Sequence, residues 1–365
     1  MNLKTAFHTK VKTPVRVDLS GGTVDIWPIY LLLEQPVTVN LAVDLFAETT
    51  LSVTPAKTGS IQLSSADRKK FIGLTPEKFL QYKAPPELVL HWKLLKYFVF
   101  ESPESQLLSS GLTGLDLKLE TRAGGPAGAG LGGSSSLAIS LAAAIAQFAW
   151  GIDQNEVLEQ REKLISIVKD VETQILGVPA GLQDYYGAAY GGLQSISWQV
   201  NGHQREPISS DIGEAFQRRI LLFYSGKSRN SGMNNWELFK GFIDRDPQIQ
   251  KNFQKISSIT AALTRALKSQ DHLEAMSLIA EEWAVRKTLA QGISTPEIDE
   301  AFSYFQSEGV RSGKICGAGG GGCFFVALPD EALKKREQLI AQVCRNGIEH
   351  LPAQFAPTGI QFGHP

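Results

Sequence analysis

A glycine-rich run at residues 124–133 constrains this chain most, because it leads directly into an apolar, alanine-rich stretch that ends near Trp150. Glycine lacks a Cβ, so the backbone N–H groups of such a run can approach a ligand closely. A helix that begins near Ser134 adds unpaired N–H groups and about half a positive charge at its N-terminus. The combination predicts a cradle for an anion, and a polyphosphate suits it.

Other interpretations of this run are tested by the residues that follow it. The Gly-x-Gly-x-x-Gly spacing at 128–133 matches a dinucleotide-binding fingerprint, with Asp153 about 20 residues further on as the ribose-binding acid. That acid should end a second strand, whereas Asp153 and Glu156 have the spacing of a helix capping box. A Walker-type loop needs a lysine where Ser134 stands, and a flexible linker would not enter so apolar a helix. An NAD-linked oxidoreductase remains an alternative that nicotinamide binding would revive.

Length and composition are typical of a two-domain enzyme. The chain has 365 residues, enough for about two domains. Lys plus Arg is 36 and Asp plus Glu is 37, so no overall field favours nucleic acid or a membrane as a partner. The chain shows neither a signal peptide nor an apolar segment of about 18 residues, so we expect a cytoplasmic protein. Cys316, Cys323 and Cys344 form no CxxC motif and no even set, and we expect buried free thiols.

Strands and helices are intermixed up to about residue 210, and long amphipathic helices dominate after it. Apolar residues alternate with polar ones over 15–20, which places Arg16 and Asp18 on the same face of a strand. The domain boundary is predicted near 200–215. Strands are expected at 15–19, 37–43, 51–54, 115–121, 193–200, 220–224, 314–318 and 323–328. Helices are expected at 87–100, 134–150, 154–176, 246–268, 271–290 and 296–308.

Two further glycine motifs flank the central one. Near the N-terminus, the first strand ends in Gly21 and Gly22, which are followed by Thr23 and Asp25. Near the C-terminus, five glycines occupy the six positions 317–322 between two expected strands. Each motif alone is weak evidence, because glycines at strand ends usually serve turns and bulges. The ordered set of three is much more specific.

The three motifs, in this order, resemble those of the GHMP kinase superfamily of galactokinase, homoserine kinase, mevalonate kinase and phosphomevalonate kinase. Residues 14–25, 126–137 and 314–322 are similar to the first, second and third family motifs, and the resemblance covers nearly the whole chain. Residues 177–192 and 283–299 look most like the corresponding segments of heptose 7-phosphate 1-kinases and fucokinases.

The resemblance implies an α+β, two-domain GHMP-kinase-like fold with the active site in the interdomain cleft. Residues 1–208 would form the N-terminal GHMP kinase domain, with its ATP-binding loop at 124–136, and residues 209–365 the C-terminal GHMP kinase domain. The implied activity is ATP- and Mg²⁺-dependent phosphorylation of a sugar hydroxyl, foremost the anomeric C1 hydroxyl of a D-glycero-D-manno-heptose 7-phosphate-like substrate. A free-sugar kinase of the fucokinase or galactokinase type, a mevalonate-type kinase and a non-catalytic sugar sensor are the alternatives. The partner would be a small sugar or sugar phosphate, and a homodimer is a possible assembly.

The resemblance also assigns roles to individual residues. Asp184 would be the catalytic base, with Arg16 beside it to help neutralise the transferring phosphoryl group. Ser134 and Glu172 would bind Mg²⁺. The implied ATP-binding residues are Gly128, Gly130, Leu131, Gly132, Gly133, Ser134 and Ser135. The implied substrate-binding residues are Asp18, Gly22, Thr23, Asp25, Gly319 and Gly320.

Without the resemblance, each of these residues has a plainer explanation. Ser134 or Ser135 would be a helix N-cap, and Glu172 a solvated acid on a helix face. Asp184, in a segment rich in small residues that we expect to be irregular, would form an Asx turn. Arg16 would pair with Asp18. The glycines of the third motif would permit close packing of strands.

One departure from the family pattern bears on the substrate. Relatives carry a hydroxyl residue immediately before the acid of the first motif, whereas this chain has Val24 before Asp25, with a hydroxyl one position earlier on Thr23. Loss of one hydrogen-bonding partner changes which substrates a site accepts, so the exact sugar stays open. Four cations are either ligands for a substrate phosphate or solvated charges. They are Lys227, Arg229, Arg286 and Lys287.

Overall fold

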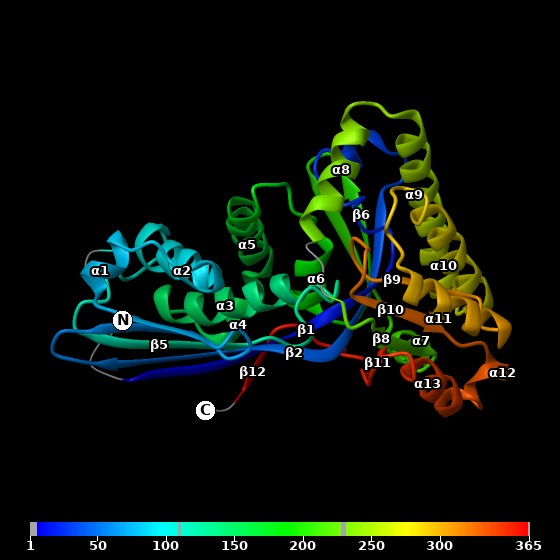
Figure 1. The fold of residues 1–365 in the computed structure, drawn as a ribbon. Helices are drawn as coiled ribbons and strands as arrows, with labels where there is room; N and C mark the ends of the chain where they lie inside the picture. The colour runs from blue at the N-terminus through cyan, green and yellow to red at the C-terminus, as the bar shows by residue number, and fades with distance from the viewer. Residues whose placement is uncertain (1–5, 109–110, 228–230, 364–365) are drawn as a thin grey trace.

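Two long antiparallel strands, β1 (Phe7–Ser20) and β2 (Val37–Pro55), form the spine of the fold (Figure 1). Valine and threonine are frequent in both strands, and such β-branched side chains favour extended backbone. β2 is a single strand where the sequence predicted two. Its first part pairs with β6 (Leu193–Gln199) and its second part with β5 (Leu115–Arg122), so it connects two sections of one sheet.

The protein is described by a computed structural model that covers residues 6–108, 111–227 and 231–363, with residues 231–235 given by their backbone only. Within that part of the chain, eight strands form the larger sheet, in the order β12-β1-β2-β5-β3-β4, with β6 attached to β2 and β7 to β6. The remaining strands of this sheet are β3 (Ser60–Ser65), β4 (Lys70–Leu74), β7 (Gly202–Ile208) and β12 (Gln361–Gly363). The last strand thus returns to pair with the first.

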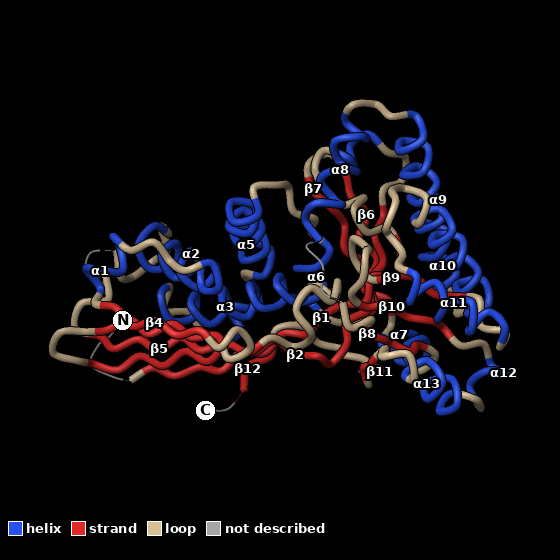
Figure 2. Tube along the Cα trace, in the orientation of Figure 1, coloured by secondary structure: helices blue, strands red, loops and turns tan. Residues whose placement is uncertain are grey.

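Helices cover one face of the larger sheet (Figure 2). The central one, α3 (Gly133–Ala149), is buried almost all round, as expected for a helix of alanine, leucine and isoleucine. It packs on β1 and β2 and forms the middle of a hydrophobic core. The other elements of this layer are α1 (Pro76–Gln81), η2 (Pro86–Leu88), α2 (Val89–Lys96), η3 (Tyr97–Glu101), α4 (Gln154–Glu159), α5 (Arg161–Leu176) and α6 (Gln183–Tyr190).

A smaller antiparallel sheet lies in the C-terminal half, in the order β11-β8-β10-β9. Its strands are β8 (Ile220–Tyr224), β9 (Ser312–Ile315), β10 (Cys323–Ala327) and β11 (Glu349–Leu351). The helices of this half are α7 (Ser210–Gln217), α8 (Ser231–Ile243), α9 (Pro247–Lys268), α10 (His272–Arg286), α11 (Pro296–Ser307), α12 (Asp330–Leu333) and α13 (Arg336–Cys344). The short η1 (Ile29–Leu32) follows the first glycine motif and contacts α8. α9 and α10 pack against each other and reach β1.

The structure corrects one of the expected helices and confirms other expectations. The helix predicted over 154–176 is interrupted at Gln160, which ends α4 and precedes α5. The predicted capping box of Asp153 and Glu156 is confirmed. The three cysteines are free thiols, as expected, although Cys344 is only half-buried. In the described part of the chain, no helix is long and apolar enough to cross a membrane. The proposed division after residue 208 would fall between β7 and α7.

Candidate active site

The three glycine motifs lie against one another. Gly130 has a φ of +77°, and a Cβ added to it would lie 2.3 Å from the carbonyl oxygen of Cys316, at the start of the third motif. The Cys323 amide, directly after that motif, donates to the Ala129 carbonyl at 2.7 Å. The Arg16 amide of β1 donates to the Leu131 carbonyl at 3.0 Å. Glycine is therefore required at 130 for close packing of backbone on backbone.

The N-terminus of α3 faces open space. Gly132 is the N-cap residue, with a φ of +71°, and no side chain caps the helix. A Cβ on Gly133 would meet no heavy atom within 4 Å, and Gly128 and Ser134 are exposed. The helix begins one residue before Ser134, so Ser134 and Ser135 are not the N-cap. No side chain therefore competes with an anion for the first amides of α3. That this run binds a polyphosphate stays a prediction.

The hydroxyls of Ser134 and Ser135 both point to Glu172, a buried residue near the C-terminal end of α5. Ser134 Oγ donates to Glu172 Oε1 at 2.6 Å, and Ser135 Oγ donates to Oε2 at 3.1 Å. Burial raises the pKa of Glu172, and the two hydroxyls partly oppose that shift. Glu172 is 5% exposed, so it is not a solvated helix-face acid. Among the described residues, no group of three or more His, Cys, Asp or Glu could hold a metal. A metal here would take oxygens from Ser134 and Glu172 and further oxygens from a ligand or water.

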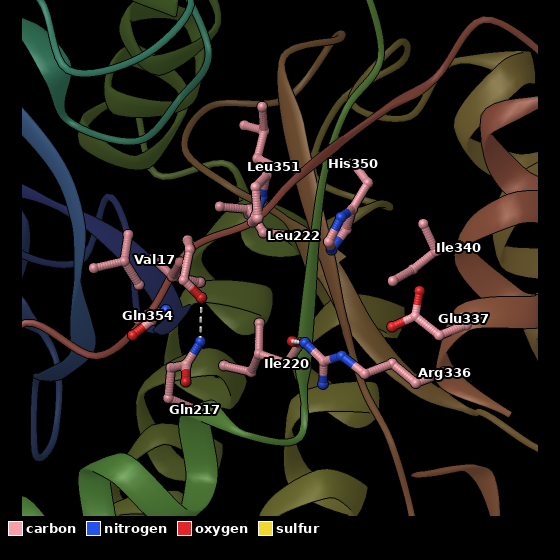
Figure 3. Close-up of a pocket in the computed structure, with 13 residues that line it drawn as sticks. Val17, Gln217, Ile220, Leu222, Arg336, Glu337, Ile340, His350, Leu351 and Gln354 are labelled. Carbon is pink, nitrogen blue, oxygen red and sulfur yellow. Dashed lines mark hydrogen bonds between the residues drawn. The ribbon is translucent and has the colours of Figure 1, made fainter. Parts of the chain in front are cut away.

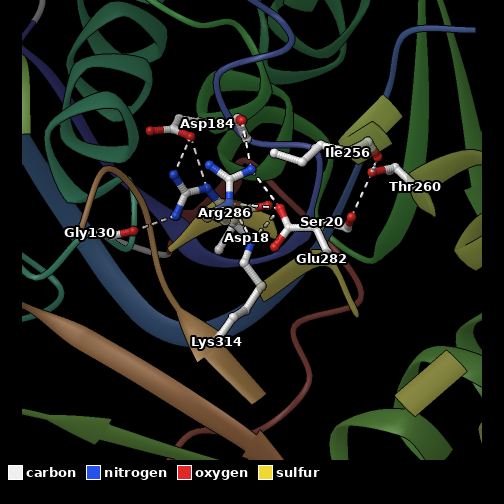
Figure 4. Close-up of polar contacts among 11 residues, drawn as sticks. Asp18, Ser20, Gly130, Asp184, Ile256, Thr260, Glu282, Arg286 and Lys314 are labelled. Carbon is white, nitrogen blue, oxygen red and sulfur yellow. Dashed lines mark hydrogen bonds and ion pairs between the residues drawn. The ribbon is translucent and has the colours of Figure 1, made fainter. Parts of the chain in front are cut away.

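Asp184 forms an ion pair with Arg16 next to this loop. Asp184 and Gly130 of the loop are labelled in Figure 4. Arg16 Nε and Nη2 donate to Asp184 Oδ1 at 2.8 and 2.5 Å, and Nη1 donates to the Gly130 carbonyl at 2.6 Å. Asp184 lies in the first turn of α6, not in the irregular segment that the sequence suggested. A Cβ on Gly132 would lie 3.2 Å from the Asp184 side chain, so the glycine lets the loop approach the carboxylate. The Asp184 side chain keeps 27% of its exposure, while that of Arg16 keeps 4%.

Asp25 joins the first glycine motif to the helix of Asp184. Its Oδ2 accepts from the amides of Leu182 and Gln183 at 2.5 and 2.8 Å, which caps the N-terminus of α6. Burial raises the pKa of Asp25 to about 6, the amides oppose that shift, and the nearby Asp184 charge adds to it. Val24 is fully buried in the core, so the position that lacks the family's hydroxyl does not reach the surface here. Thr23 adopts a φ of +76° and is 8% exposed.

Asp18, which the resemblance assigned to substrate binding, is completely buried and does not reach the surface of the site. Its Oδ2 is 3.0 Å from Lys314 Nζ, and a Cβ on Gly22 would lie 2.4 Å from the same oxygen. Lys314 also contacts Glu282, which pairs with Arg286. Sequence reasoning did not single out Lys314 and Glu282 as site residues. The available signal was a lysine as the first residue of the third motif, in an expected strand whose other residues carry no charge.

The third motif supports a neighbouring segment. The Gly320 amide donates to the Ile293 carbonyl at 2.6 Å, and a Cβ on Gly319 would lie 2.7 Å from that oxygen. These contacts fit the plainer explanation, in which the glycines permit close packing. Their role toward a substrate stays a prediction.

The four candidate phosphate-binding cations fall into different environments. Arg286 is 3% exposed and paired, so it is not a solvated charge. Lys227 pairs with Glu297 on the surface. Lys287 is exposed and lines a cavity of about 500 Å³ beside Ile293. Arg229 lies outside the described residues.

A second cavity, of about 300 Å³, lies away from this site (Figure 3). Val17 of β1 lines it, together with residues of β8, α13 and β11. Neighbouring side chains of a strand point to opposite faces, so Val17 faces this cavity while Arg16 and Asp18 face the glycine loops. The cavity is therefore separate from the site assembled by the three motifs.

The chain matches two family models. The model described as GHMP kinases N terminal domain matches residues 92–192, and the model described as GHMP kinases C terminal matches residues 263–348. Between them they contain α3, Glu172, Asp184, α10 and the third motif.

Curated relatives are similar over most of this chain. It is 26% identical to the Arabidopsis thaliana bifunctional fucokinase/GDP-fucose pyrophosphorylase over 90% of this chain, but it spans only 30% of that longer protein. It is 24% identical to the Campylobacter jejuni D-glycero-alpha-D-manno-heptose 7-phosphate kinase, over 87% of this chain and 88% of the relative.

A solved structure shares the fold. The crystal structure of a D-glycero-D-manno-heptose 1-phosphate kinase from Bacteroides thetaiotaomicron superposes with a TM-score of 0.70 at 17% identity, over 98% of this chain and 99% of that one. The likeness shows that the predicted mixed α and β architecture of two domains is correct.

Proposed function

The chain belongs to the GHMP kinase family, and from that premise we propose that it transfers the terminal phosphoryl group of ATP to a sugar hydroxyl. The acceptor is foremost the anomeric C1 hydroxyl of a D-glycero-D-manno-heptose 7-phosphate-like sugar. The observation that carries the proposal is the placement of the Arg16–Asp184 pair against the glycine loop and the open N-terminus of α3. Phosphoryl transfer needs mainly positioning and charge neutralisation, which this arrangement supports.

Asp184 takes the role of the base. Its carboxylate accepts the proton of the acceptor hydroxyl as the hydroxyl oxygen forms a bond to the terminal phosphorus, while the bond to the bridging oxygen breaks and ADP leaves. Arg16 holds one carboxylate oxygen through two N–H groups, which fixes the direction of Asp184. Because Asp184 remains partly exposed, an acceptor can approach it.

The glycine loop and the first amides of α3 would hold the phosphates. Bound Mg²⁺ would neutralise phosphate charge during the transfer. Ser134 and Glu172 fit that ion, because their oxygens lie together at the entrance of the loop and Mg²⁺ prefers hard oxygen ligands. Asp184, Glu172 and Ser134 are all present, which argues against a non-catalytic sugar sensor.

One substitution tests the cradle without disturbing the fold. Gly133→Val places a branched side chain in open space where a phosphate would lie, so ATP binding should weaken strongly while thermal unfolding stays unchanged. Gly130→Val is not a clean test, since it collides with the Cys316 backbone. Unchanged Mg-ATP affinity in Gly133→Val, measured by calorimetry, would exclude this loop as the phosphate site.

The acceptor is decided by a substrate panel. Purified protein with Mg-ATP is given fucose, galactose, sugar 6- and 7-phosphates including D-glycero-D-manno-heptose 7-phosphate, mevalonate and homoserine, and ADP release is followed. We expect the heptose 7-phosphate to give the highest kcat/KM, with phosphate on C1 by ³¹P NMR. Turnover of fucose or galactose with every phosphosugar inert would favour a free-sugar kinase. Mevalonate as the best substrate would exclude the sugar class.

Lys287 is our candidate for holding the phosphate that a heptose 7-phosphate already carries. It is exposed, and it lines the 500 Å³ cavity next to the segment that binds Gly320. Lys287→Gln should raise KM for the phosphosugar and leave KM for ATP unchanged. Lys255→Gln, which removes a surface lysine of α9 paired with Glu281, is the matched control and should change neither constant.

A further inference from the structure

Four charged side chains are buried together beneath the first glycine motif (Figure 4). Asp18 of β1, Lys314 of β9 and Glu282 of α10 have no exposed side-chain surface, and the side chain of Arg286, also on α10, is 4% exposed. Two of them lie on α10, and the other two come from β1 near the N-terminus and β9 near the C-terminus. We call them the buried charge cluster.

The contacts within the cluster form a chain. Lys314 Nζ lies 3.0 Å from Asp18 Oδ2 and 3.3 Å from Glu282 Oε1. Arg286 Nε donates to Glu282 Oε1 at 2.7 Å, and its Nη2 lies 2.6 Å from the same oxygen. The same Nη2 donates to the Gly22 carbonyl at 2.9 Å. Lys314, Arg286 and Arg16 lower the pKa of Asp18 against the opposite effect of burial, which keeps it ionised.

Stability alone is a poor explanation of this cluster. Removing charges from water costs free energy, and well-packed apolar residues in their place are often as stabilising or more so. The two acids and two bases balance, but each had to lose its hydration. A cluster of this kind is better explained by a backbone conformation that it holds in place.

The geometry in question is that of the turn at residues 21–25. Gly22 is held from two sides, because its carbonyl accepts from Arg286 and its Cα packs on the Asp18 carboxylate with no room for a Cβ. Three residues later, Asp25 caps α6, the helix that carries Asp184. Contacts therefore run from α10 through Gly22 and Asp25 to the base.

We propose that Arg286 and Glu282, supported by Lys314 and Asp18, are positioning residues that fix the turn at 21–25 relative to Asp184. The inference rests on the proposed kinase function and deepens it. The cluster sets how well the acceptor is bound and oriented, whereas ATP binding depends on the separate glycine loop. Asp18 then supports the acceptor site from below and does not touch the sugar.

The primary test is Arg286→Lys, which keeps the positive charge beside Glu282 but cannot hold Glu282 and the Gly22 carbonyl together through a planar fork. We expect KM for the best acceptor of the panel to rise on the order of tenfold or more, with KM for ATP within about twofold of wild type. The control is Glu281→Gln on the same helix, which breaks only the exposed pair with Lys255 and should change neither constant.

A second readout does not depend on turnover. Hydrogen–deuterium exchange of the amides at residues 21–25 and in the first turn of α6 should accelerate in Arg286→Lys and remain as in wild type in Glu281→Gln. If the wild-type protein phosphorylates no acceptor, the proposed function is contradicted. Accelerated exchange of these segments in Arg286→Lys would still support the positioning role. Exchange unchanged in both segments would overturn it.

A charge-balanced variant covers the case in which Arg286→Lys does not fold. Glu282→Gln/Arg286→Gln removes one acid and one base and leaves Asp18 paired with Lys314. It should fold, raise KM for the acceptor and leave KM for ATP nearly unchanged. Equal increases in both constants, or an acceptor KM within about twofold of wild type in a folded variant, would show that the cluster is structural only.

Discussion

Strand β1 contributes to two ion pairs from positions two residues apart on one face, and their surroundings differ. Arg16 pairs with Asp184, which keeps 27% of its side-chain exposure, whereas Asp18 pairs with Lys314 and neither has any exposure. Gly22 covers the second pair, while the first lies beside the open glycine loop. Of these two pairs, Arg16–Asp184 is the one that a ligand can reach. The exposure of the side chains therefore distinguishes a pair suited to catalysis from a pair that supports the fold, although both begin on the same face of one strand.

The largest expected effect is that of Asp184→Asn, which preserves shape and removes the base. We expect kcat to fall by on the order of 10²–10⁴, with ATP affinity nearly intact. The midpoint of thermal unfolding should also fall, because the buried Arg16 loses its counter-charge, but by less than for the fully buried pair, since Asp184 is partly exposed and Asn can still accept from Arg16. Retention of more than about a third of the wild-type rate, in an assay limited by chemistry, would remove Asp184 from the role of base. Asp170→Asn, at an exposed acid of α5, is the control.

Breaking the buried pair of Asp18 and Lys314 should instead have its main effect on the free energy of unfolding. Lys314→Met leaves Asp18 and Glu282 with Arg286 as their remaining cation in the cluster, and removing one partner of a buried ion pair costs about 3–5 kcal/mol. Urea unfolding monitored by circular dichroism measures the loss. Lys255→Met breaks a half-exposed pair and should cost about 0–1 kcal/mol. Similar losses in the two variants would contradict the distinction between the pairs.

Sequence alone predicted part of this contrast. Alternation along β1 placed Arg16 and Asp18 on one face, and the glycine spacing with the apolar run after it predicted the open helix N-terminus. These features are local, so a single segment contains them. The pairing of Asp184 with Arg16 came from resemblance to a family, because the two residues are 168 positions apart and no local pattern records their contact.

The cluster partners could not be predicted for the same reason. Periodicity shows which face of a strand is buried but not which side chain from another segment faces it, and Asp18 and Lys314 are 296 residues apart. The helix of Asp184 was missed because its start is satisfied from outside by Asp25, so no capping residue precedes it in the sequence. Strand β12 has only three residues, too few for periodicity, and pairs with the distant β1.

Glu172 extends the comparison to an acid that is buried yet borders the open loop. Glu172→Gln keeps hydrogen-bonding capacity toward Ser134 and Ser135 but removes the charge. The Mg²⁺ concentration for half-maximal rate should rise about tenfold or more, and ATP binding should weaken less. Ser134→Ala should shift Mg²⁺ dependence in the same direction. If both variants keep the wild-type Mg²⁺ dependence, neither residue is a metal ligand.

The smallest expected effect concerns pH and Asp25, the carboxylate that links the two ion pairs. Its pKa is raised from 3.8 to about 6, so the fold favours the protonated form. The stability it contributes is complete below pH 3.8 and is lost as pH rises through about 6. Asp18 has a lowered pKa, so its contribution is lost at the acid end instead. Stability and the proposed function therefore depend on pH in opposite directions. The fold favours protonated Asp25, whereas ionised Asp25 is the stronger acceptor for the amides that begin α6.

We accordingly expect KM for the acceptor to rise severalfold between pH 7 and about pH 5.5, with a smaller change in KM for ATP. Steady-state rates across pH 5–8 measure this. Asp25→Asn should bind the acceptor weakly at every pH, and its KM should no longer rise at acid pH. This result would distinguish Asp25 from Glu172, whose pKa is also raised. If the rise persists in Asp25→Asn, the titrating group is another residue, and Asp25 does not connect the exposed pair to the buried one through its charge.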